Sequence, residues 1–321
     1  MNRFDTGRRQ VLLGLAAALF SSISRSEAPA ELRIGLQKSS VNLAVLRARG
    51  ALAAQLPGVR VSWADFPAGP QLLEALNAGS IDFGMTGDTP PVFSQAANSA
   101  MVYVGTEPPK PENSAILVKP DGALKTLADL RGRRIAFQKG SSAHYVVLRA
   151  LEKAGIGYGE IDPIYLAPAD ARAAFERGSV DAWSIWDPYW AAAEEGAAVR
   201  VLTTGRGLSD NSTFYLASKR WAERNPAAVS ALLAALTEAD HYVQSHADEA
   251  AQLVATATGV PLSAAVRFLR RRPRSPVIPL DDATIAAQQT LADTFQKAGL
   301  IPKPIRIADA VWHASTQTTR R

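Results

Sequence analysis

Strand patterns and helix patterns alternate along most of the chain, and this alternation restricts the possible folds more than any other feature. Residues 32–36 are expected to form a strand, residues 42–56 a helix, and residues 59–66 a second strand. The alternation continues to about residue 203, and from residue 226 the pattern is almost entirely helical. Strands separated by helices of this length predict βαβ units in the α/β class, with mostly parallel sheets flanked by helices.

The alternating region contains two series that echo each other. Gly79 and Gly178 are each followed at the same spacing by serine and aspartate, and Asp88 and Asp187 keep the same offset of 99 positions. Two similar lobes are the simplest explanation, with proline- and glycine-rich crossings near residues 108–111 and 205–207. We therefore expect one lobe from residues 31–115 and 210–321, a second from residues 116–209, and a cleft between them.

The first thirty residues have the layout of an export signal rather than of a folded element. Arg3, Arg8 and Arg9 supply a positive start, residues 11–20 are apolar, and small residues lead to an expected cleavage after Ala30. This apolar stretch is too short to span a bilayer, which takes about twenty residues. The Arg8–Arg9 pair resembles a twin-arginine signal, although glycine stands at position 7 where serine or threonine is usual. The expected location is the periplasm.

Composition excludes several classes of function. The chain has no cysteine, so it has no disulfide, no cysteine-ligated metal and no thiol nucleophile. It also lacks a phosphate loop and a Gly-x-Ser-x-Gly elbow, and no cofactor is expected. The net charge is +5, and the one basic cluster, residues 267–274, lacks interleaved aromatic residues apart from Phe268. We interpret it as a solvated face, with contact to a membrane partner or lipid headgroups as the alternative, and not as a nucleic-acid site.

Four turns at the ends of predicted strands are the candidate ligand site: residues 37–40, 86–90, 138–144 and 186–189. Ligands of open α/β sheets bind at the carboxyl ends of the strands. Each turn also opens a helix, whose first N–H groups have no internal partner and whose dipole favours an anion. Glycines there allow close approach of the backbone, and hydroxyls add donors. The candidate contacts are Gln37, Gly87, Asp88, Thr89, Gly140, Ser141, Ser142, His144, Trp183, Trp186 and Asp187.

Each candidate also has a purely structural interpretation. Asp88, Thr89 and Ser141 are common helix caps whatever the ligand. The two tryptophans could belong to the core instead of lining an apolar pocket, and His144 could lie on the surface. If Asp88 and Asp187 formed an acid/base pair across the cleft, the protein would be an enzyme. Their predicted cap positions make this the less favoured alternative.

The same segments resemble the periplasmic binding proteins for aliphatic sulfonates and the related taurine- and nitrate-binding proteins. Leu36 departs from the tyrosine that is common in related proteins. The matching stretches are residues 34–38, 69–76, 79–84, 86–91, 139–144, 186–189 and 214–217.

The resemblance implies a two-lobe periplasmic-binding-protein fold of type II that closes on its ligand and delivers it to an ABC permease in the inner membrane. By motif match it implies that Gln37, Gly87, Thr89, Ser142 and His144 face the sulfonate. Trp183, Trp186 and Asp187 would then lie nearer its organic tail. The expected ligand is an alkanesulfonate, with taurine, nitrate, sulfate or a pyrimidine-type vitamin precursor as alternatives. The protein is expected to be a monomer.

Overall fold

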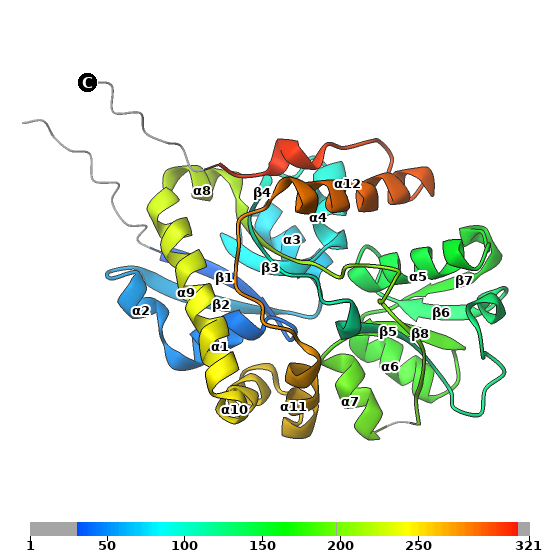
Figure 1. The fold of residues 1–321 in the computed structure, drawn as a ribbon. Helices are drawn as coiled ribbons and strands as arrows, with labels where there is room; N and C mark the ends of the chain where they lie inside the picture. The colour runs from blue at the N-terminus through cyan, green and yellow to red at the C-terminus, as the bar shows by residue number, and fades with distance from the viewer. Residues whose placement is uncertain (1–30, 197, 314–321) are drawn as a thin grey trace, which may run out of the picture.

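The computed structural model describes residues 31–196 and 198–313, and they form two five-stranded sheets (Figure 1). The predicted export signal, residues 1–30, lies outside the described residues. The first sheet has the order β2 (Arg60–Phe66), β1 (Glu31–Gln37), β3 (Phe83–Gly87), β10 (Thr213–Ser218) and β4 (Met101–Glu107). The second has the order β7 (Asp162–Tyr165), β6 (Arg134–Phe137), β8 (Ala182–Trp186), β5 (Ser114–Val118) and β9 (Arg200–Thr204).

Four of the five strands in each sheet run in the same direction, as the alternating pattern predicted. The exceptions are β10 and β5, which pair antiparallel with both of their neighbours. Each of them is the strand that the chain enters after crossing from the other sheet. The division expected between residues 115 and 116 falls inside β5, all of which pairs in the second sheet, whereas the division at 209/210 falls between β9 and β10.

Helices cover both faces of each sheet, as an α/β lobe requires in order to bury a parallel sheet. The first sheet packs on one face against α1, α9 and α10, and on the other against α3, α4 and α12. The second packs against α5 on one face and against α6 and α7 on the other. The helices are α1 (Val41–Arg49), α2 (Leu52–Gln55), α3 (Gly69–Asn77), α4 (Thr89–Ala96), α5 (Ser142–Lys153), α6 (Pro168–Glu176), α7 (Tyr189–Gly196), α8 (Lys219–Arg224), α9 (Pro226–Ser245), α10 (Ala247–Thr258), α11 (Leu262–Arg271) and α12 (Asp282–Lys297), with 3-10 turns η1 (Pro111–Asn113), η2 (Leu127–Leu130), η3 (Tyr158–Glu160) and η4 (Ile307–Ala310).

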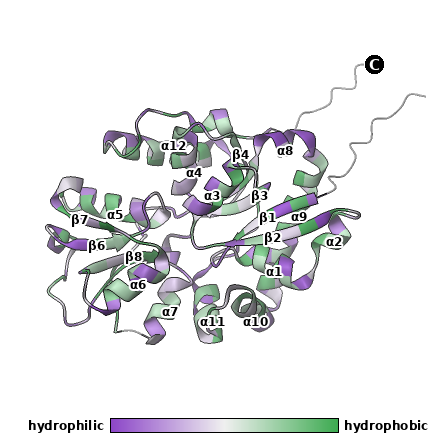
Figure 2. Cartoon of the chain, turned by 180° about the vertical axis from the view of Figure 1, so that it is seen from behind, coloured by the Kyte–Doolittle hydropathy of each residue, from purple (hydrophilic) through white to green (hydrophobic). Residues whose placement is uncertain are grey.

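Two helical segments differ from the sequence expectation. The single helix predicted over residues 42–56 is interrupted, because Gly50 adopts the left-handed conformation at φ 61° and caps α1. The helix α8 was not predicted at all. Its residues are mostly charged, and Figure 2 draws it largely purple, so it offers no apolar periodicity to recognise.

The sequence echo corresponds to a matched ion pair in each lobe. In the first lobe the backbone N–H of Arg33 donates to Asp82 Oδ2 (3.0 Å), and its guanidinium bonds both carboxylate oxygens. In the second lobe Arg134 makes the same three bonds to Asp181, with its N–H at 2.9 Å from Oδ2. The two lobes are therefore built on one plan, as the 99-residue offset indicated.

Within the described ranges, no single helix is both long and apolar enough to cross a bilayer. The helices α10 and α11 meet the length and composition criteria only as a pair, and that pair is bent by 119°.

Candidate functional site

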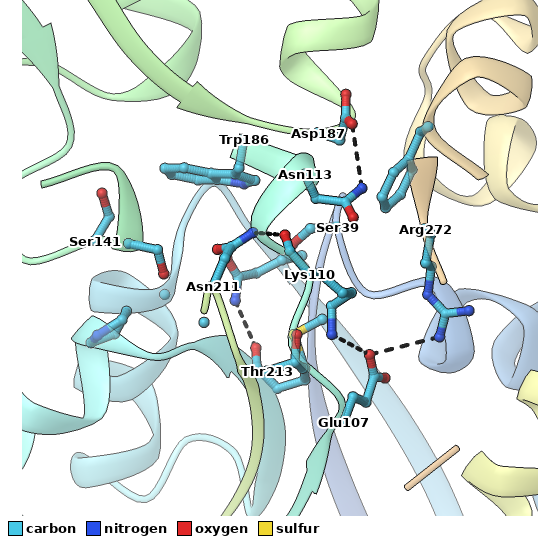
Figure 3. Close-up of a pocket in the computed structure, with 17 residues that line it drawn as sticks. Ser39, Glu107, Lys110, Asn113, Ser141, Trp186, Asp187, Asn211, Thr213 and Arg272 are labelled. Carbon is cyan, nitrogen blue, oxygen red and sulfur yellow. Dashed lines mark hydrogen bonds and ion pairs between the residues drawn. The ribbon is translucent and has the colours of Figure 1, made fainter. Parts of the chain in front are cut away.

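A cavity of about 60 Å³ lies between the lobes, at the carboxyl ends of the strands (Figure 3). Residues from both sheets and from the two crossings line it, so it exists only while the lobes are together. The lining residues are Gln37, Ser39, Gly69, Met85, Gly87, Pro90, Glu107, Lys110, Asn113, Ser141, Ser142, Trp186, Asp187, Asn211, Thr213, Phe268 and Arg272.

Five helices begin at this cavity. In the first lobe, Ser39 lies two residues before α1, Gly69 is the first residue of α3, and Gly87 lies two residues before α4. In the second lobe, Ser142 is the first residue of α5, and Asp187 lies two residues before α7. The first N–H groups of each helix have no partner inside it, and each helix start carries roughly half a positive charge. This convergence of helix starts favours an anion in the cavity.

Gly87 of the first lobe faces Ser142 of the second. A Cβ atom placed on Gly87 would lie only 2.2 Å from the Ser142 hydroxyl oxygen, so no larger residue fits without displacing that hydroxyl. Ser141 donates its own hydroxyl to the Gln138 carbonyl (2.7 Å), which fixes the turn before α5. Gln37 donates from Nε2 to the Met85 carbonyl (2.6 Å) and is thereby held against β3.

Apolar side chains form part of the wall. Trp186 lies at the end of β8, and Figure 3 shows its ring on the opposite side of the hollow from Thr213 and Glu107. Met85 from β3 and Phe268 from α11 also line the cavity. A purely inorganic anion has no apolar part for such a wall to contact, whereas an organic anion does.

A buried charge network forms the floor in the first lobe, and sequence reasoning missed it. Lys110 Nζ donates to Glu107 Oε2 (3.0 Å), and Arg272 lies 3.7 Å from the same oxygen. Arg272 also pairs with Asp240 (2.8 Å). Burial disfavours the charged Glu107 carboxyl, but Lys110 and Arg272 outweigh that effect and lower its pKa. Asn42 joins the network by donating to Glu107 Oε1 (3.0 Å).

These partners come from segments far apart in the sequence, so no local pattern identified them. The interpretation of residues 267–274 as a solvated face is wrong for Arg272, which is 7% exposed, and for Arg271, whose side chain is 19% exposed and paired with Asp187. It holds for Arg270 and Arg274, which are exposed. A run of arginines does not by itself show which of its members turn inward.

Asp187 joins the second lobe to α11 of the first. Its carboxylate accepts from Arg271 Nη1 (3.0 and 3.3 Å), from Asn113 Nδ2 (3.4 Å) and from the Ala191 N–H (3.0 Å). Burial raises the pKa of Asp187 to about 6, and Arg271 opposes that rise. The Ala191 bond caps α7, as the residue type suggested.

Six of the eleven sequence candidates line the cavity, and His144 does not. His144 is fully buried and stacks on Phe137 with ring centres 4.9 Å apart. Its Nδ1 accepts the Gly140 N–H (3.2 Å), so the proton is on Nε2, which lies 2.9 Å from the Tyr158 hydroxyl. Its expected position facing the ligand is therefore corrected to a position behind the turn that carries Ser141.

The other four candidates also lie outside the lining. Trp183 points to the opposite face of β8 from the cavity and packs against Phe175, so its expected place in the cleft is corrected to the core. Asp88 accepts from the hydroxyls of Thr89 (3.1 Å) and Ser209 (3.2 Å), and its pKa is raised by burial. Gly140 has φ +70°, which suits glycine in the turn before α5.

No group of three or more His, Cys, Asp or Glu side chains within residues 31–196 and 198–313 is arranged to hold a metal ion.

We compared the chain with known protein families and with related proteins. Residues 58–250 match the family model described as NMT1/THI5 like. The chain is 45% identical over 301 residues to the putative aliphatic sulfonates-binding protein of Escherichia coli, with 94% of each chain covered. The chain belongs to this family of binding proteins.

Solved structures agree with the assignment. The alkanesulfonate-binding protein SsuA from Xanthomonas axonopodis pv. citri, bound to MOPS, is 45% identical and superposes with a TM-score of 0.85 over 88% of this chain and 98% of that one. The desulfurization enzyme DSZB is only 17% identical and has a TM-score of 0.64, covering 88% of this chain and 96% of its own. The latter likeness concerns the fold alone, and it shows that the fold does not decide between binding and catalysis.

Proposed function

We propose that the protein captures an organic sulfonate in the cavity between its lobes and delivers it unchanged to an ABC permease in the inner membrane. The observation that carries the proposal is the meeting of five helix starts at one cavity that also has an apolar wall. Helix starts and hydroxyls suit the charged head, and Trp186, Met85 and Phe268 suit the organic tail. The binding of MOPS, a sulfonate, by the Xanthomonas relative supports this choice of ligand.

The physics of the head group fits a carrier. A sulfonate is an anion at every physiological pH, so recognition does not depend on its protonation. Hydrogen bonds to an ion are roughly twice as strong as neutral ones, and they strengthen when closure removes water. A ligand that contacts both lobes stabilises the closed form by its differential affinity for that form. The permease would then meet a closed, loaded protein in the periplasm.

The test is calorimetry on the chain without residues 1–30, in Tris chloride, against MOPS, ethanesulfonate, taurine, sulfate and nitrate. The sulfonates with an organic tail should bind at least about tenfold more tightly than the inorganic anions, because a hydrophobic contact of a few methylenes adds roughly 0.8 kcal/mol for each. Sulfate or nitrate binding more tightly than every sulfonate would contradict the proposal. A proton NMR spectrum of MOPS before and after long incubation should be identical, and any product signal would point to an enzyme.

A further inference from the structure

Two adjacent arginines at the end of α11 make side-chain contacts with different lobes. Arg272 turns into the first lobe, where it bonds Asp240 Oδ1 (2.8 Å) and Asn42 Oδ1 (3.0 Å) and has a side chain only 3% exposed. Arg271 turns the other way, across the cleft, and contacts Asp187 and Glu194 of the second lobe. The end of α11 is therefore anchored on one side and reaches over to the other.

The contacts of Arg271 with the second lobe are dense. Its Nη1 lies 3.0 Å from Asp187 Oδ1, its Nη2 pairs with Glu194, and its guanidinium carbon lies 3.7 Å from the ring centre of Trp190. The Asp187 side chain is fully buried, and that of Arg271 is 19% exposed. Arg267, one helical turn earlier, adds a looser pair to Glu194 at 3.5 Å. Removing one partner of an ion pair with this degree of burial leaves the other charge buried and unpaired, which costs more than the same change in an exposed pair.

From this geometry we infer that Arg271 is a positioning residue, which holds the lobes closed over the cavity and neutralises the carboxylate of Asp187 beside the bound anion. The inference rests on the proposed function for the ligand and goes beyond it in naming what sets the closed state. Asp187 lines the cavity and bonds Asn113, another lining residue (Figure 3). In an open form these lobe-to-lobe bonds would separate, and Asp187 and Glu194 would return to water.

The variant Arg271→Met keeps much of the length of the side chain and removes its charge. It should weaken MOPS binding about 10- to 100-fold at pH 8, mainly through faster dissociation, because closure then leaves the buried Asp187 carboxylate without a cationic partner and Glu194 with only the looser pair to Arg267. The matched control is Arg270→Met, which makes the same charge change on the same helix at an exposed position. That control should bind like the unmodified protein. Equal affinities for Arg271→Met and the control would overturn the inference.

The pH profile separates neutralisation from a general packing defect. The groups that face Asp187 are Arg271 from α11, the uncharged Asn113 from η1, and Glu194 from α7. Glu194 is also paired with Arg267. The pKa of Asp187 is about 6 in the closed form, so the affinity of the unmodified protein for MOPS should not change with pH above that value. Without Arg271 the pKa of Asp187 in the closed form moves higher. The affinity of Arg271→Met for MOPS should therefore fall as the pH rises from 6 to 8. A flat profile for that variant would contradict neutralisation.

A double substitution gives a second check on the same point. If Arg271 acts by neutralising Asp187, then Arg271→Met combined with Asp187→Asn should bind more tightly than Arg271→Met alone. Losses that simply add would show that the two residues act separately and would overturn the inference.

A measurement without ligand keeps this inference separable from the proposed function. The chain has no cysteine, so Ser80→Cys and Ser179→Cys, exposed and equivalent positions of the two lobes, can carry a pair of fluorophores. Single-molecule energy transfer should show a closed population about tenfold smaller in Arg271→Met than in the unmodified protein or Arg270→Met. Equal closed populations would overturn the inference even if MOPS binds. Failure of the unmodified protein to bind any sulfonate would instead refute the proposed function alone.

Discussion

At the scale of single residues, Gly87 and Ser142 both line the cavity and face each other from opposite lobes. Gly87→Ala would push the Ser142 hydroxyl out of its position, because the new Cβ would lie 2.2 Å from it, while the Ser142 Cβ at 3.4 Å could stay. A hydrogen bond to an ion contributes about 1.5–3 kcal/mol, so calorimetry with MOPS should show a loss of about 10-fold or more.

The control for this prediction is Ser142→Ala. Once the hydroxyl is gone, Gly87→Ala has nothing left to displace, so the double variant should bind no more weakly than Ser142→Ala alone. Losses that add in the double variant would mean that the alanine disturbs the backbone and not the hydroxyl.

His144 makes a prediction about stability and not about binding. Burial, with Lys139 adding to it, lowers its pKa to about 3, whereas the unfolded chain takes up the proton near pH 6.5. The stability from neutral His144 is therefore complete above pH 6.5 and is lost as pH falls from there toward 3. Relative to His144→Gln, the free energy of unfolding of the unmodified protein should fall by up to about 1.4 kcal/mol per pH unit.

Urea unfolding of both proteins at pH 7, 6 and 5 measures this difference. His144→Gln retains an acceptor for the Gly140 N–H and cannot titrate, which makes it the appropriate reference. A constant difference between the two proteins across this range would show that the pKa of His144 is the same in the folded and unfolded states, as for an exposed histidine.

From the sequence, a residue's place at the cavity could be predicted where its position along the backbone decides that place. Gly87 and Trp186 end the strands β3 and β8, and Ser142 begins α5, so the turns between strand and helix place them at the cavity edge. The prediction was wrong for His144 and Trp183, because tertiary packing determines which way a side chain inside a helix or strand points. The helix α5 turns His144 into an aromatic cluster, and the alternation of β8 turns Trp183 away from the Trp186 side.

At the scale of elements, the two matched ion pairs should differ in their contribution to stability. Asp82→Ala removes a carboxylate 10% exposed, and Asp181→Ala one 26% exposed. Each carboxylate accepts hydrogen bonds from a strand N–H and from a guanidinium, so removing either one should lower the free energy of unfolding. The loss should be larger for the more buried carboxylate. We expect about 2–3 kcal/mol for Asp82→Ala and about 1 kcal/mol for Asp181→Ala.

Urea unfolding midpoints test the order, and MOPS affinity is the control. Neither aspartate lines the cavity, so binding by the folded variants should stay unchanged. A larger loss for Asp181→Ala would mean that the second lobe depends on its ion pair for reasons other than burial.

Element-scale prediction was the most successful because periodicity reports it directly. The apolar alternation of β1 (Leu32, Ile34, Leu36) and the long apolar helix α9 were both recognised. What the pattern did not reveal was a break whose only signal is one glycine, Gly50, and a helix such as α8, whose place is set by its contacts with β10 and β4. Tertiary packing decides such elements, and a single sequence does not record it.

At the scale of the whole molecule, the offset of 99 residues identified two lobes, but it could not identify what joins them when closed. The joining contacts pair α11 with α7, and Arg271 with Asp187, across 84 positions of sequence. The lobes follow from repeated local patterns, whereas closure depends on charges brought together from segments far apart. This is why the sequence indicated a cleft and missed both the network around Glu107 and the bridge through Arg271.

The surface favours a monomer, and this is the prediction for the whole molecule. Among residues 31–196 and 198–313, the large apolar side chains that are exposed are Tyr165, Leu262 and Ile278, which belong to β7, α11 and the segment before α12. They lie on three different elements, whereas a stable interface needs a large continuous patch. The edge strand β7 is only four residues long and contains Pro163, and the edge strand β2 carries Arg60, so neither invites pairing with a second chain.

Light scattering after gel filtration should therefore give the mass of one chain, both without ligand and with saturating MOPS. The second condition matters, because α11 and α7 are in contact in this structure, and the proposed opening of the lobes would separate them and change the surface that they share. A mass of two chains only with MOPS would mean that the closed form associates through that surface, and it would contradict the expectation that single copies meet the permease. A mass of two chains in both conditions would require apolar area that the described surface does not offer.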